Sequence, residues 1–538
     1  MPAALRPERV PARPLAGLAA LLGLRPVGPH GGQQAGPGLT GITHDSRAVR
    51  PGDLYAALPG STVHGSRFCE DAAVAGAVAV LTDPSGRDAA VRAGLPVFVV
   101  ADPRARLGEV ASWIYDDPSG KLLLIGVTGT AGKSTSTYLL ESGLRAAGYQ
   151  TGLIGGVQVR VGSTVLDSGL TTPESTDLQA LLAAMVERGA TAAAMEVSSH
   201  ALALGRVAGT SYDVAVFTNL SQDHLDFHET IDAYFAAKAT LFTPDYARAG
   251  VVNIDDEHGR VLAAAPRIPI TTYSAAGNPA ADWRAADVRG GADGSAFRVV
   301  GPGGVEADAS VALAGPFNVA NALGAIVALV ESGVGIATAV RGVAACPGVP
   351  GRLERVEAGQ DFTVLVDYSH KPGAVRAVLD ALRPVTAGSL TIVLGCGGDR
   401  DRAKRPLMGA AAAGLADTAI LTSDNPRSED PLGILAEMLT GALTVPAASR
   451  AHVIVEPDRG AAIALAISRA AKGDVVLIAG KGHESGQYAG TSVIPFDDRE
   501  VAADVLGRRL ASARADGPAA PPSDDLPTDD LLTDMGDL

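Results

Sequence analysis

The sequence predicts an α/β protein of three domains: a small mixed α/β domain near the N-terminus, a central domain built on a parallel sheet, and a doubly wound C-terminal domain. The chain has 538 residues, which is more than one domain usually holds. Most of it alternates short, continuously apolar runs with Ala-rich stretches of helical character. This alternation is typical of parallel sheets that are covered by helices on both faces.

The composition excludes wholesale disorder and a general nucleic-acid binder. Hydrophobic residues make up 47% of the chain and charged residues 19%, which is enough apolar material for several cores. Lys and Arg number 44 against 59 Asp and Glu, so the net charge is −15 and the chain as a whole repels phosphate backbones. Any phosphate site must therefore be local, and we expect small-molecule substrates rather than nucleic acid.

Both ends of the chain are expected to lie outside the folded domains. Residues 1–40 are rich in Pro, Ala and Arg and predict a flexible extension with one short helix at 14–24. Four leucines share one face of that helix and no small-residue cleavage site follows, which favours a core helix over a signal peptide. Residues 509–538 are rich in Asp, Pro and Ala and predict a disordered acidic tail, either solubilising or partner-binding.

Cysteine usage and hydropathy indicate the compartment. Cys69, Cys346 and Cys396 are too widely separated for a disulfide framework or a spaced zinc site, so we expect a reducing environment. No apolar stretch is long enough to span a bilayer. The sequence therefore predicts a cytoplasmic protein without a membrane span, and we expect a monomer.

The first two folded domains are expected at residues 41–119 and 120–347. In the first, short apolar runs are broken by Gly and Pro, and a polar turn at 116–120 ends the domain. In the second, an antiparallel edge is expected at 275–310 and a closing helix at 318–333. Its buried parallel strands are expected at 122–127, 192–197, 214–217 and 251–254.

The last folded domain is expected at residues 348–508, after a Pro- and Gly-rich linker. Five apolar runs with helices between them predict a second doubly wound, Rossmann-like sheet. Ligands of such folds bind outside the carboxyl ends of the strands, where the polar clusters of this chain also fall. The five runs are 363–366, 390–394, 419–421, 453–455 and 475–478.

The strongest local signal is a Gly-rich turn between the run at 122–127 and a predicted helix. It reads Gly129-Thr-Ala-Gly-Lys133-Ser134-Thr135. Glycine amides can converge on phosphate oxygens, Lys133 neutralises them, and the helix N-terminus adds its dipole. Gly126 lies one residue too early for the general P-loop spacing. Strand, Gly-Lys-Ser and helix together still predict a P-loop ATPase-like central domain, with a hydroxyl of Ser134 or Thr135 on magnesium.

Two further clusters lie at the ends of neighbouring predicted strands. Glu196 ends one strand and His224 follows the next, and a carboxylate and a histidine beside a phosphate loop suit a magnesium site; helix caps and surface residues are the alternative. Lys238 lies on the apolar face of a predicted helix at 231–242. Burial would lower its pKa and let the neutral amine react with carbon dioxide, whereas the alternative is a lysine that reaches solvent.

Together these clusters resemble the ATP-dependent Mur ligases of peptidoglycan synthesis. The family's motifs occur here in the family's order, from about residue 43 to residue 506. Asp424-Asn425-Pro426-Arg427 matches the recognition motif of the members that add meso-diaminopimelate. Arg427 can clamp a carboxylate with two hydrogen bonds, and Pro426 stiffens its loop, although an Asn-Pro-Arg sequence by itself is more often only a turn.

The resemblance assigns roles to positions of this chain. It implies catalytic roles for Lys133, Lys238, His224 and Glu196, with Lys238 carbamylated to N6-carboxylysine and Mg²⁺ held by Ser134, Glu196, His224 and that carbamate. It implies ATP contacts from Gly129, Thr130, Ala131, Gly132, Lys133, Ser134, Thr135, Asn318, Arg352 and Asp367. It implies contacts to the uridine-nucleotide dipeptide from His44, Ser46, Thr171, Thr172, Ser198 and Arg206. It implies diaminopimelate contacts from Arg400, Asp424, Asn425, Pro426, Arg427, Gly480 and Glu484.

The activity that the resemblance implies is ATP-dependent joining of meso-diaminopimelate to UDP-MurNAc-L-Ala-D-Glu through an acyl phosphate. Four positions depart from the family pattern. Ala131 stands where the family usually has Asn, and Ser134 where it has Thr, although serine still offers a hydroxyl to magnesium. Leu170 and Leu204 occupy places where polar substrate contacts are expected.

Four rival functions remain. The same scaffold would serve a folylpolyglutamate synthase or a lysine-adding member of the family, and the motif at Asp424 to Arg427 argues against both. A catalytically silent nucleotide-binding subunit is disfavoured because four residues occur together: Lys133, Glu196, His224 and Lys238. A transporter ATPase is disfavoured because no membrane-partner surface is evident.

Overall fold

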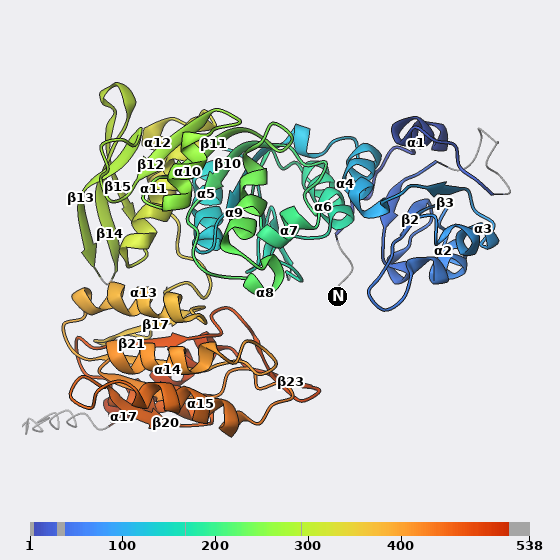
Figure 1. The fold of residues 1–538 in the computed structure, drawn as a ribbon. Helices are drawn as coiled ribbons and strands as arrows, with labels where there is room; N and C mark the ends of the chain where they lie inside the picture. The colour runs from blue at the N-terminus through green and yellow to red at the C-terminus, as the bar shows by residue number, and fades with distance from the viewer. Residues whose placement is uncertain (1–4, 29–37, 167, 292, 516–538) are drawn as a thin grey trace, which may run out of the picture.

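The computed structural model describes residues 5–28, 38–166, 168–291 and 293–515, which form three domains. The first domain and the C-terminal domain both lie against the central domain, on different sides of it (Figure 1). The predicted three-domain α/β architecture is confirmed. None of the helices in the described part of the chain is both long and apolar enough to cross a membrane.

The first domain is a four-stranded parallel sheet in the order β1-β2-β3-β4, with helices packed on it. Asp102 caps α4 through a hydrogen bond from the Ala105 amide, and Pro103 fits the first turn because it lacks an amide hydrogen. The elements are β1 (Gly41–Thr43), β2 (Asp53–Ala57), β3 (Ala79–Thr82), β4 (Val97–Val99), α2 (Cys69–Val74), α3 (Arg87–Arg92) and α4 (Pro103–Ile114).

The described part of residues 1–40 is not a separate extension, so that expectation is wrong for it. Helix α1 (Leu15–Leu22) packs Leu18, which is fully buried, into the core of the first domain. Arg6 forms an ion pair of 2.7 Å with the buried Asp53, and Arg13 pairs with Leu39 in a β-bridge. Apolar contacts and a buried charge pair therefore tie this segment to the domain, which begins before residue 41.

The central domain contains an eleven-stranded sheet whose middle seven strands are parallel, in the order β13-β12-β11-β10-β5-β9-β6. These strands are β5 (Leu123–Thr128), β6 (Thr151–Ile154), β9 (Ala192–Glu196), β10 (Tyr212–Phe217), β11 (Ala247–Asn253), β12 (Ile270–Ser274) and β13 (Trp283–Gly291). Antiparallel strands extend both edges. They are β7 (Val159–Val161) and β8 (Thr164–Leu166) at one edge, and β14 (Gly294–Val300) and β15 (Glu306–Val311) beside β13 at the other, where the antiparallel edge was predicted.

Helices cover both faces of this sheet, because successive strand residues alternate between two cores. Ile125 and Val127 of β5 pack with α5 and α11, whereas Leu124 packs with α6 and α9. The helices are α5 (Lys133–Ala146), α6 (Ser175–Glu187), α7 (Ser199–Ala203), α8 (Leu225–His228), α9 (Ile231–Ala239), α10 (Glu257–Ala264), α11 (Pro316–Glu331) and α12 (Ile336–Ala344). The helix predicted at 231–242 is α9 followed by a 3₁₀ turn, Thr240–Phe242.

The C-terminal domain has five parallel strands in the order β17-β21-β18-β19-β20, with β16 (Glu354–Arg355) antiparallel at one edge. The five parallel strands are β17 (Thr363–Asp367), β18 (Leu390–Leu394), β19 (Thr418–Leu421), β20 (His452–Val455) and β21 (Val475–Ala479). They coincide with the five predicted runs. Helices α13 (Pro372–Leu382), α14 (Lys404–Leu415), α15 (Pro431–Leu443), α16 (Arg459–Arg469) and α17 (Asp498–Ala515) cover the two faces, and β22 (Gly486–Ala489) and β23 (Ser492–Pro495) form a separate hairpin.

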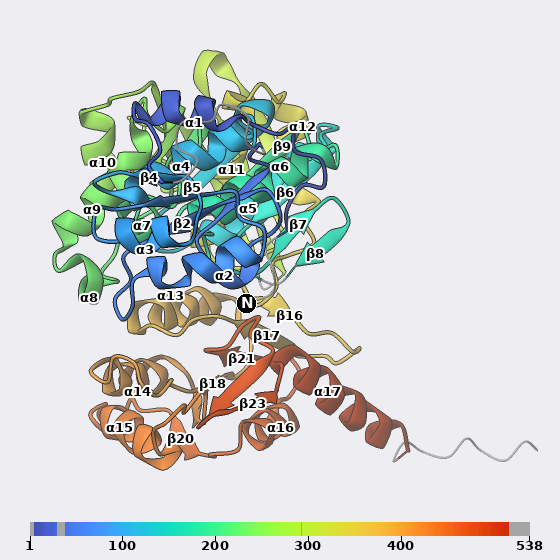
Figure 2. The same cartoon turned by 90° about the vertical axis from the view of Figure 1, so that its right-hand side faces the viewer.

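Helix α17 continues to Ala515, so the chain is still helical at residue 509, where the tail was expected to begin. The helix starts beside β17 and points outward from one side of the C-terminal domain (Figure 2). Most of the acidic stretch lies outside the described residues.

Candidate functional site

The phosphate loop joins the end of β5 to the start of α5, as predicted. Gly129 has φ +149° and Gly132 has φ +88°, and a Cβ at Gly129 would lie 1.9 Å from the Thr218 hydroxyl. Only glycine fits there. Lys133 Nζ donates to the Gly129 carbonyl at 2.9 Å and to the Thr130 carbonyl at 3.1 Å. Burial, the largest cause, lowers the pKa of Lys133.

The segment after β10 holds this loop in shape. The Thr218 hydroxyl donates to the Ala131 carbonyl at 2.7 Å, and the Asn219 side chain accepts from the Ala131 amide at 3.0 Å. Thr130 Oγ1 donates to the Ser221 carbonyl at 3.2 Å and accepts from its amide at 3.0 Å. These contacts were not predicted from the sequence, although the segment's hydroxyl and amide side chains, Thr218, Asn219 and Ser221, were a signal for them.

Glu196 ends β9 beside the loop and is buried. Its Oε1 accepts from the Ser134 hydroxyl at 2.9 Å and from the Gly156 amide at 2.9 Å. The structure therefore brings together two of the predicted magnesium ligands, a hydroxyl and a carboxylate. Both are hard oxygen donors of the kind that Mg²⁺ binds.

His224, the third predicted ligand, adopts a left-handed backbone conformation with φ +52°. Burial lowers the pKa of His224 to about 4, so its ring is neutral at pH 7 and its free nitrogen can act as a ligand. Nε2 lies 3.2 Å from Asp223 Oδ2. In the part of the chain that the structure describes, no three His, Cys, Asp or Glu side chains converge on one metal position. The hydroxyl of Ser134 and the carboxylate of Glu196 fit Mg²⁺, which takes few protein ligands and keeps water and phosphate oxygens.

Lys238 lies on α9 and is 1% exposed, so the predicted burial is confirmed. Its Nζ donates to the Gly129 carbonyl at 2.8 Å and lies 4.6 Å from the centre of the Tyr234 ring. Tyr234 in turn hydrogen-bonds Thr130 at 3.1 Å between the hydroxyl oxygens. Burial, followed by repulsion from Lys133, lowers the pKa of Lys238 well below its usual value.

The residues predicted to hold the dipeptide lie near Glu196. The Thr172 hydroxyl donates to the Glu196 carbonyl at 2.9 Å and accepts from the Ser198 amide at 3.1 Å. Arg206 forms an ion pair of 2.8 Å with Glu174. Thr171 lies against Gly156, where an added Cβ would be 3.0 Å from the Thr171 hydroxyl.

The first domain reaches the central domain through His44, which follows β1. Nδ1 of His44 lies 3.1 Å from the Thr176 hydroxyl of α6. Ser46 begins a 3₁₀ turn capped by Asp45. The two positions predicted to contact the uridine nucleotide are thus on one loop at the boundary between the two domains.

Residues of the C-terminal domain border the phosphate loop. Arg352 lies 4.5 Å from the Tyr368 ring centre and donates to the Ser134 hydroxyl at 3.4 Å. Asp367 accepts from the Leu353 amide at 2.8 Å. Asn318, at the start of α11, donates to the Ala314 carbonyl at 2.8 Å. Of the three predicted contacts, Arg352 is therefore the one that directly joins the two domains at the loop.

A second link between these domains was not predicted. Lys371, just before α13, forms an ion pair with Asp223, which is 148 positions earlier in the chain. This pair holds the C-terminal domain next to His224. Sequence reasoning could not pair the two residues, because nothing local relates positions so far apart.

The predicted amino-acid site lies at the carboxyl ends of β18, β19 and β21. Asp424 and Asn425 are buried, and Arg427 donates to the Gly398 carbonyl at 2.7 Å. Gly480 has φ +113° and an added Cβ would lie 2.7 Å from Asp424 Oδ2. Glu484 accepts from the Asn425 amide at 2.8 Å. Pro426 and Arg400 lie on the same pair of loops, which the hydrogen bond from the Gly398 amide to the Asn425 carbonyl joins.

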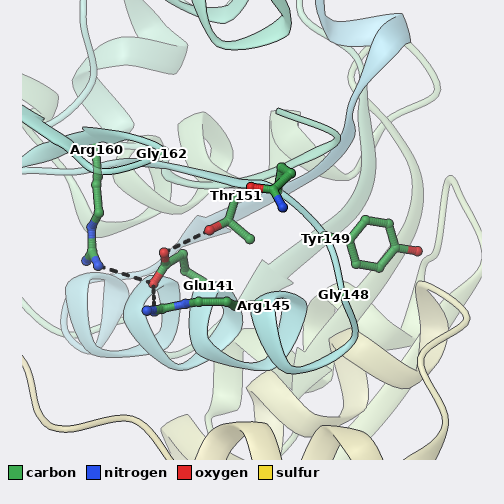
Figure 3. Close-up of a pocket in the computed structure, with 8 residues that line it drawn as sticks. Glu141, Arg145, Gly148, Tyr149, Thr151, Arg160 and Gly162 are labelled. Atoms are coloured by element: carbon green, nitrogen blue, oxygen red, sulfur yellow. Dashed lines mark hydrogen bonds and ion pairs between the residues drawn. The ribbon is translucent and has the colours of Figure 1, made fainter. Parts of the chain in front are cut away.

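A cavity of about 330 Å³ lies away from this site (Figure 3). Its lining includes Arg145 and Arg160, which face the buried Glu141 at 2.7 and 3.6 Å. Arg145 is near the C-terminal end of α5, about 18 Å along the helix from Lys133 at the usual rise per residue. The cavity is therefore separate from the phosphate loop.

Three family models match the chain, one for each domain. They are described as "Mur ligase family, catalytic domain" over residues 38–115, "Mur ligase middle domain" over 127–329, and "Mur ligase, glutamate ligase domain" over 351–482.

Named relatives and a solved structure match nearly the whole chain. A "UDP-N-acetylmuramoyl-L-alanyl-D-glutamate--2,6-diaminopimelate ligase" of Streptomyces coelicolor is 59% identical over 93% of this chain and 98% of its own length. A "UDP-N-acetylmuramyl-tripeptide synthetase" of Leifsonia xyli subsp. xyli is 47% identical over 93% and 97%. A solved structure of a 2,6-diaminopimelate ligase bearing the same name as the first relative has a TM-score of 0.67 and 32% identity, and covers 93% of this chain and 100% of its own.

Proposed function

Because the chain belongs to the Mur ligase family, we propose that it joins meso-diaminopimelate to UDP-MurNAc-L-Ala-D-Glu at the expense of ATP. The products are the UDP-MurNAc-tripeptide of peptidoglycan synthesis, ADP and phosphate. The observation that carries the choice of amino acid is the buried loop at Asp424 to Arg427, set between the strand ends of the C-terminal domain. The name of the Streptomyces relative supports the same reaction.

The reaction requires two steps, because a carboxylate is a poor electrophile. The γ-carboxylate of D-Glu attacks the γ-phosphorus of ATP, and ADP leaves. An uncharged amine of diaminopimelate then attacks the acyl phosphate, phosphate leaves, and the nitrogen loses a proton as the amide forms. Lys133 and Arg352, which contact the phosphate loop, would offset the negative charge on the transferred phosphoryl group.

Magnesium and a modified lysine complete the proposed phosphoryl site. Ser134, Glu196 and His224 would hold Mg²⁺, with Lys238 as a carbamate supplying a further anionic ligand. Bound Mg²⁺ would neutralise charge on the phosphate oxygens. The depressed pKa of Lys238 supports the modification, because only an uncharged amine reacts with carbon dioxide.

Arg427 gives the amino-acid site its selectivity in this proposal. Diaminopimelate carries a carboxylate at its far end, and L-lysine carries only an ammonium group there. A guanidinium can bind the carboxylate with two parallel hydrogen bonds. The site therefore favours diaminopimelate over L-lysine, and the Leifsonia relative, whose name leaves the added residue open, makes L-lysine the comparison to test.

Phosphate release tests the proposal. Purified protein with ATP, Mg²⁺ and UDP-MurNAc-L-Ala-D-Glu is expected to release phosphate with meso-diaminopimelate and at least tenfold less with L-lysine, at equal concentrations. Lys133→Ala should abolish release with both, whereas Lys472→Ala, an exposed lysine, should change nothing. Equal use of L-lysine would overturn the selectivity, and no release with either amino acid would overturn the ligase activity.

ATP as co-substrate is consistent with a cytoplasmic enzyme, and we propose that location. Cys69, Cys346 and Cys396 are free and buried, as expected of a reducing compartment.

A further inference from the structure

Lys481 lies behind the amino-acid site, and none of the roles above uses it. Its side chain is 0% exposed. Nζ donates to the Gly486 carbonyl at 2.6 Å and to Asn425 Oδ1 at 3.1 Å, and it lies 3.4 Å from Glu484 Oε2. A fully buried ammonium is costly unless such partners satisfy it, so this lysine is held in one place.

Lys481 fixes the orientation of the Asn425 amide. Asn425 Oδ1 accepts from Lys481 and also from the Tyr488 amide at 3.1 Å. Both of these groups can only donate, so the carbonyl oxygen of the side chain must face them and the NH₂ group must face the other way. One of its N–H groups donates to Glu484 Oε2 at 2.8 Å. The other N–H has no acceptor among the residues that the structure describes, so it is available to a ligand.

Lys481 also positions the Glu484 carboxylate. The contact between Nζ and Oε2 and the hydrogen bond from Asn425 both act on the same oxygen. The side chain of Glu484 is 32% exposed, so a ligand can still reach it. Behind these residues, the Tyr488 carbonyl accepts from the Arg427 amide at 2.9 Å, which ties strand β22 to the recognition loop.

We propose that Lys481 is a positioning residue that sets the polarity of the amino-acid site. Through Lys481, Asn425 presents a donor and Glu484 presents an acceptor next to each other. That pair suits a ligand carrying a carboxylate and an ammonium on one carbon. Such a group forms the far end of diaminopimelate, whereas the far end of L-lysine has only the ammonium. The inference rests on the proposed function and adds the residue that enforces its selectivity.

The test is Lys481→Met, which keeps an unbranched side chain and removes the donors. The expected result is a KM for diaminopimelate at least tenfold higher, with KM for ATP and for the uridine substrate within twofold of wild type. The preference for diaminopimelate over L-lysine should fall at least tenfold, because Asn425 can then turn its oxygen toward the ligand carboxylate. The control is Lys472→Met, which should leave all of these values unchanged.

A double-mutant cycle separates positioning from mere structural support. Because Lys481 acts through Asn425 as well as Glu484, Lys481→Met should lower the preference less in an Asn425→Ala background than in wild type. Additive losses, or equal increases in KM for all three substrates, would overturn the proposal.

A second variant keeps the proposal testable if Lys481→Met does not fold. Asn425→Asp retains a partner for Lys481 but replaces the donor by an acceptor, so it should raise the KM for diaminopimelate at least tenfold. An unchanged KM would overturn the proposal. Wild-type protein that uses neither amino acid would instead contradict the proposed function itself.

Discussion

At the scale of single residues, two ammonium groups converge on one carbonyl oxygen. Lys133 and Lys238 both donate to the Gly129 carbonyl, at 2.9 and 2.8 Å. Lys238 is buried and Lys133 is half-buried. Burial is the largest cause that lowers the pKa of each, and repulsion from Lys133 lowers the pKa of Lys238 further. A negative group on Lys238 would relieve this repulsion, which is the physical reason to expect the carbamate.

Replacing Lys238 by Ala should abolish turnover while the protein still binds the uridine substrate. The loss follows because the anionic ligand disappears from the phosphoryl site. A small carboxylic acid in the assay should restore part of the activity by occupying the vacated space. Steady-state phosphate release checks this, and normal turnover by the variant would contradict the role given to Lys238.

His370 should make stability depend on pH between about 4 and 6.5. Burial, followed by repulsion from Lys371, lowers its pKa to about 4, and Nδ1 donates to the Tyr368 carbonyl at 2.7 Å. Between pH 6.5 and 4, His370 is protonated in the unfolded chain but stays neutral in the folded protein. The free energy of unfolding therefore falls as the pH falls toward 4, by at most about 1.4 kcal/mol per pH unit for this one proton.

Denaturant titrations at several pH values between 4 and 7 measure this dependence. His370→Gln should flatten the curve relative to wild type. An unchanged slope in the variant would show that His370 does not carry the effect.

At the scale of elements, the two ends of α5 give a matched pair of glycines. Gly132 precedes the helix and Gly148 follows it, with φ +88° and +90°. A Cβ at Gly132 would lie 2.3 Å from Asn321 Oδ1, whereas a Cβ at Gly148 would meet no atom within 4 Å. A side chain would therefore meet similar backbone strain at Gly132 and at Gly148, but it would clash with a neighbouring atom only at Gly132.

Gly132→Ala should weaken ATP binding at least tenfold, because the loop must shift away from Asn321. Gly148→Ala should cost about 1 kcal/mol of stability from its left-handed backbone and leave ATP affinity unchanged. Calorimetric titration with ATP compares the two variants. Equal affinities would contradict the placement of the nucleotide at this loop.

Much of the fold could be predicted, since continuous apolar runs mark buried strands without reference to distant residues. The runs at 122–127 and 363–366 became β5 and β17. Helix α1 was predicted as a helix, but its segment was expected to be a flexible extension. Its packing could not be predicted, because the strands that bury it come later in the chain. The burial of Lys481 could not be predicted from its Gly-rich stretch, because one of its acceptors, Asn425, lies 56 positions earlier and is brought to it only by the fold.

At the scale of the whole molecule, the candidate site exists only where three domains meet. His44 of the first domain contacts Thr176, and Arg352 of the last contacts Ser134. The ion pair of Lys371 with Asp223 adds a half-buried link beside them. The domains must therefore stay together for the acyl group, the phosphate and the amine to meet.

Lys371→Met should lower kcat/KM for diaminopimelate about fivefold, since about 1 kcal/mol of attraction between domains is lost. Asp223→Asn should do the same, and the double variant should be no worse than either. Arg376→Met, an exposed position on α13, serves as the control. Additive losses in steady-state kinetics would contradict a shared ion pair.

The central claim is that the D-Glu carboxylate is phosphorylated and then captured by diaminopimelate. The most direct measurement uses UDP-MurNAc-L-Ala-D-Glu labelled with ¹⁸O in that carboxylate, followed by mass spectrometry of the released phosphate and of the peptide product. The account predicts one ¹⁸O atom in each phosphate and a product heavier by one diaminopimelate residue. Phosphate free of the label, released alongside that product, would contradict the acyl-phosphate route.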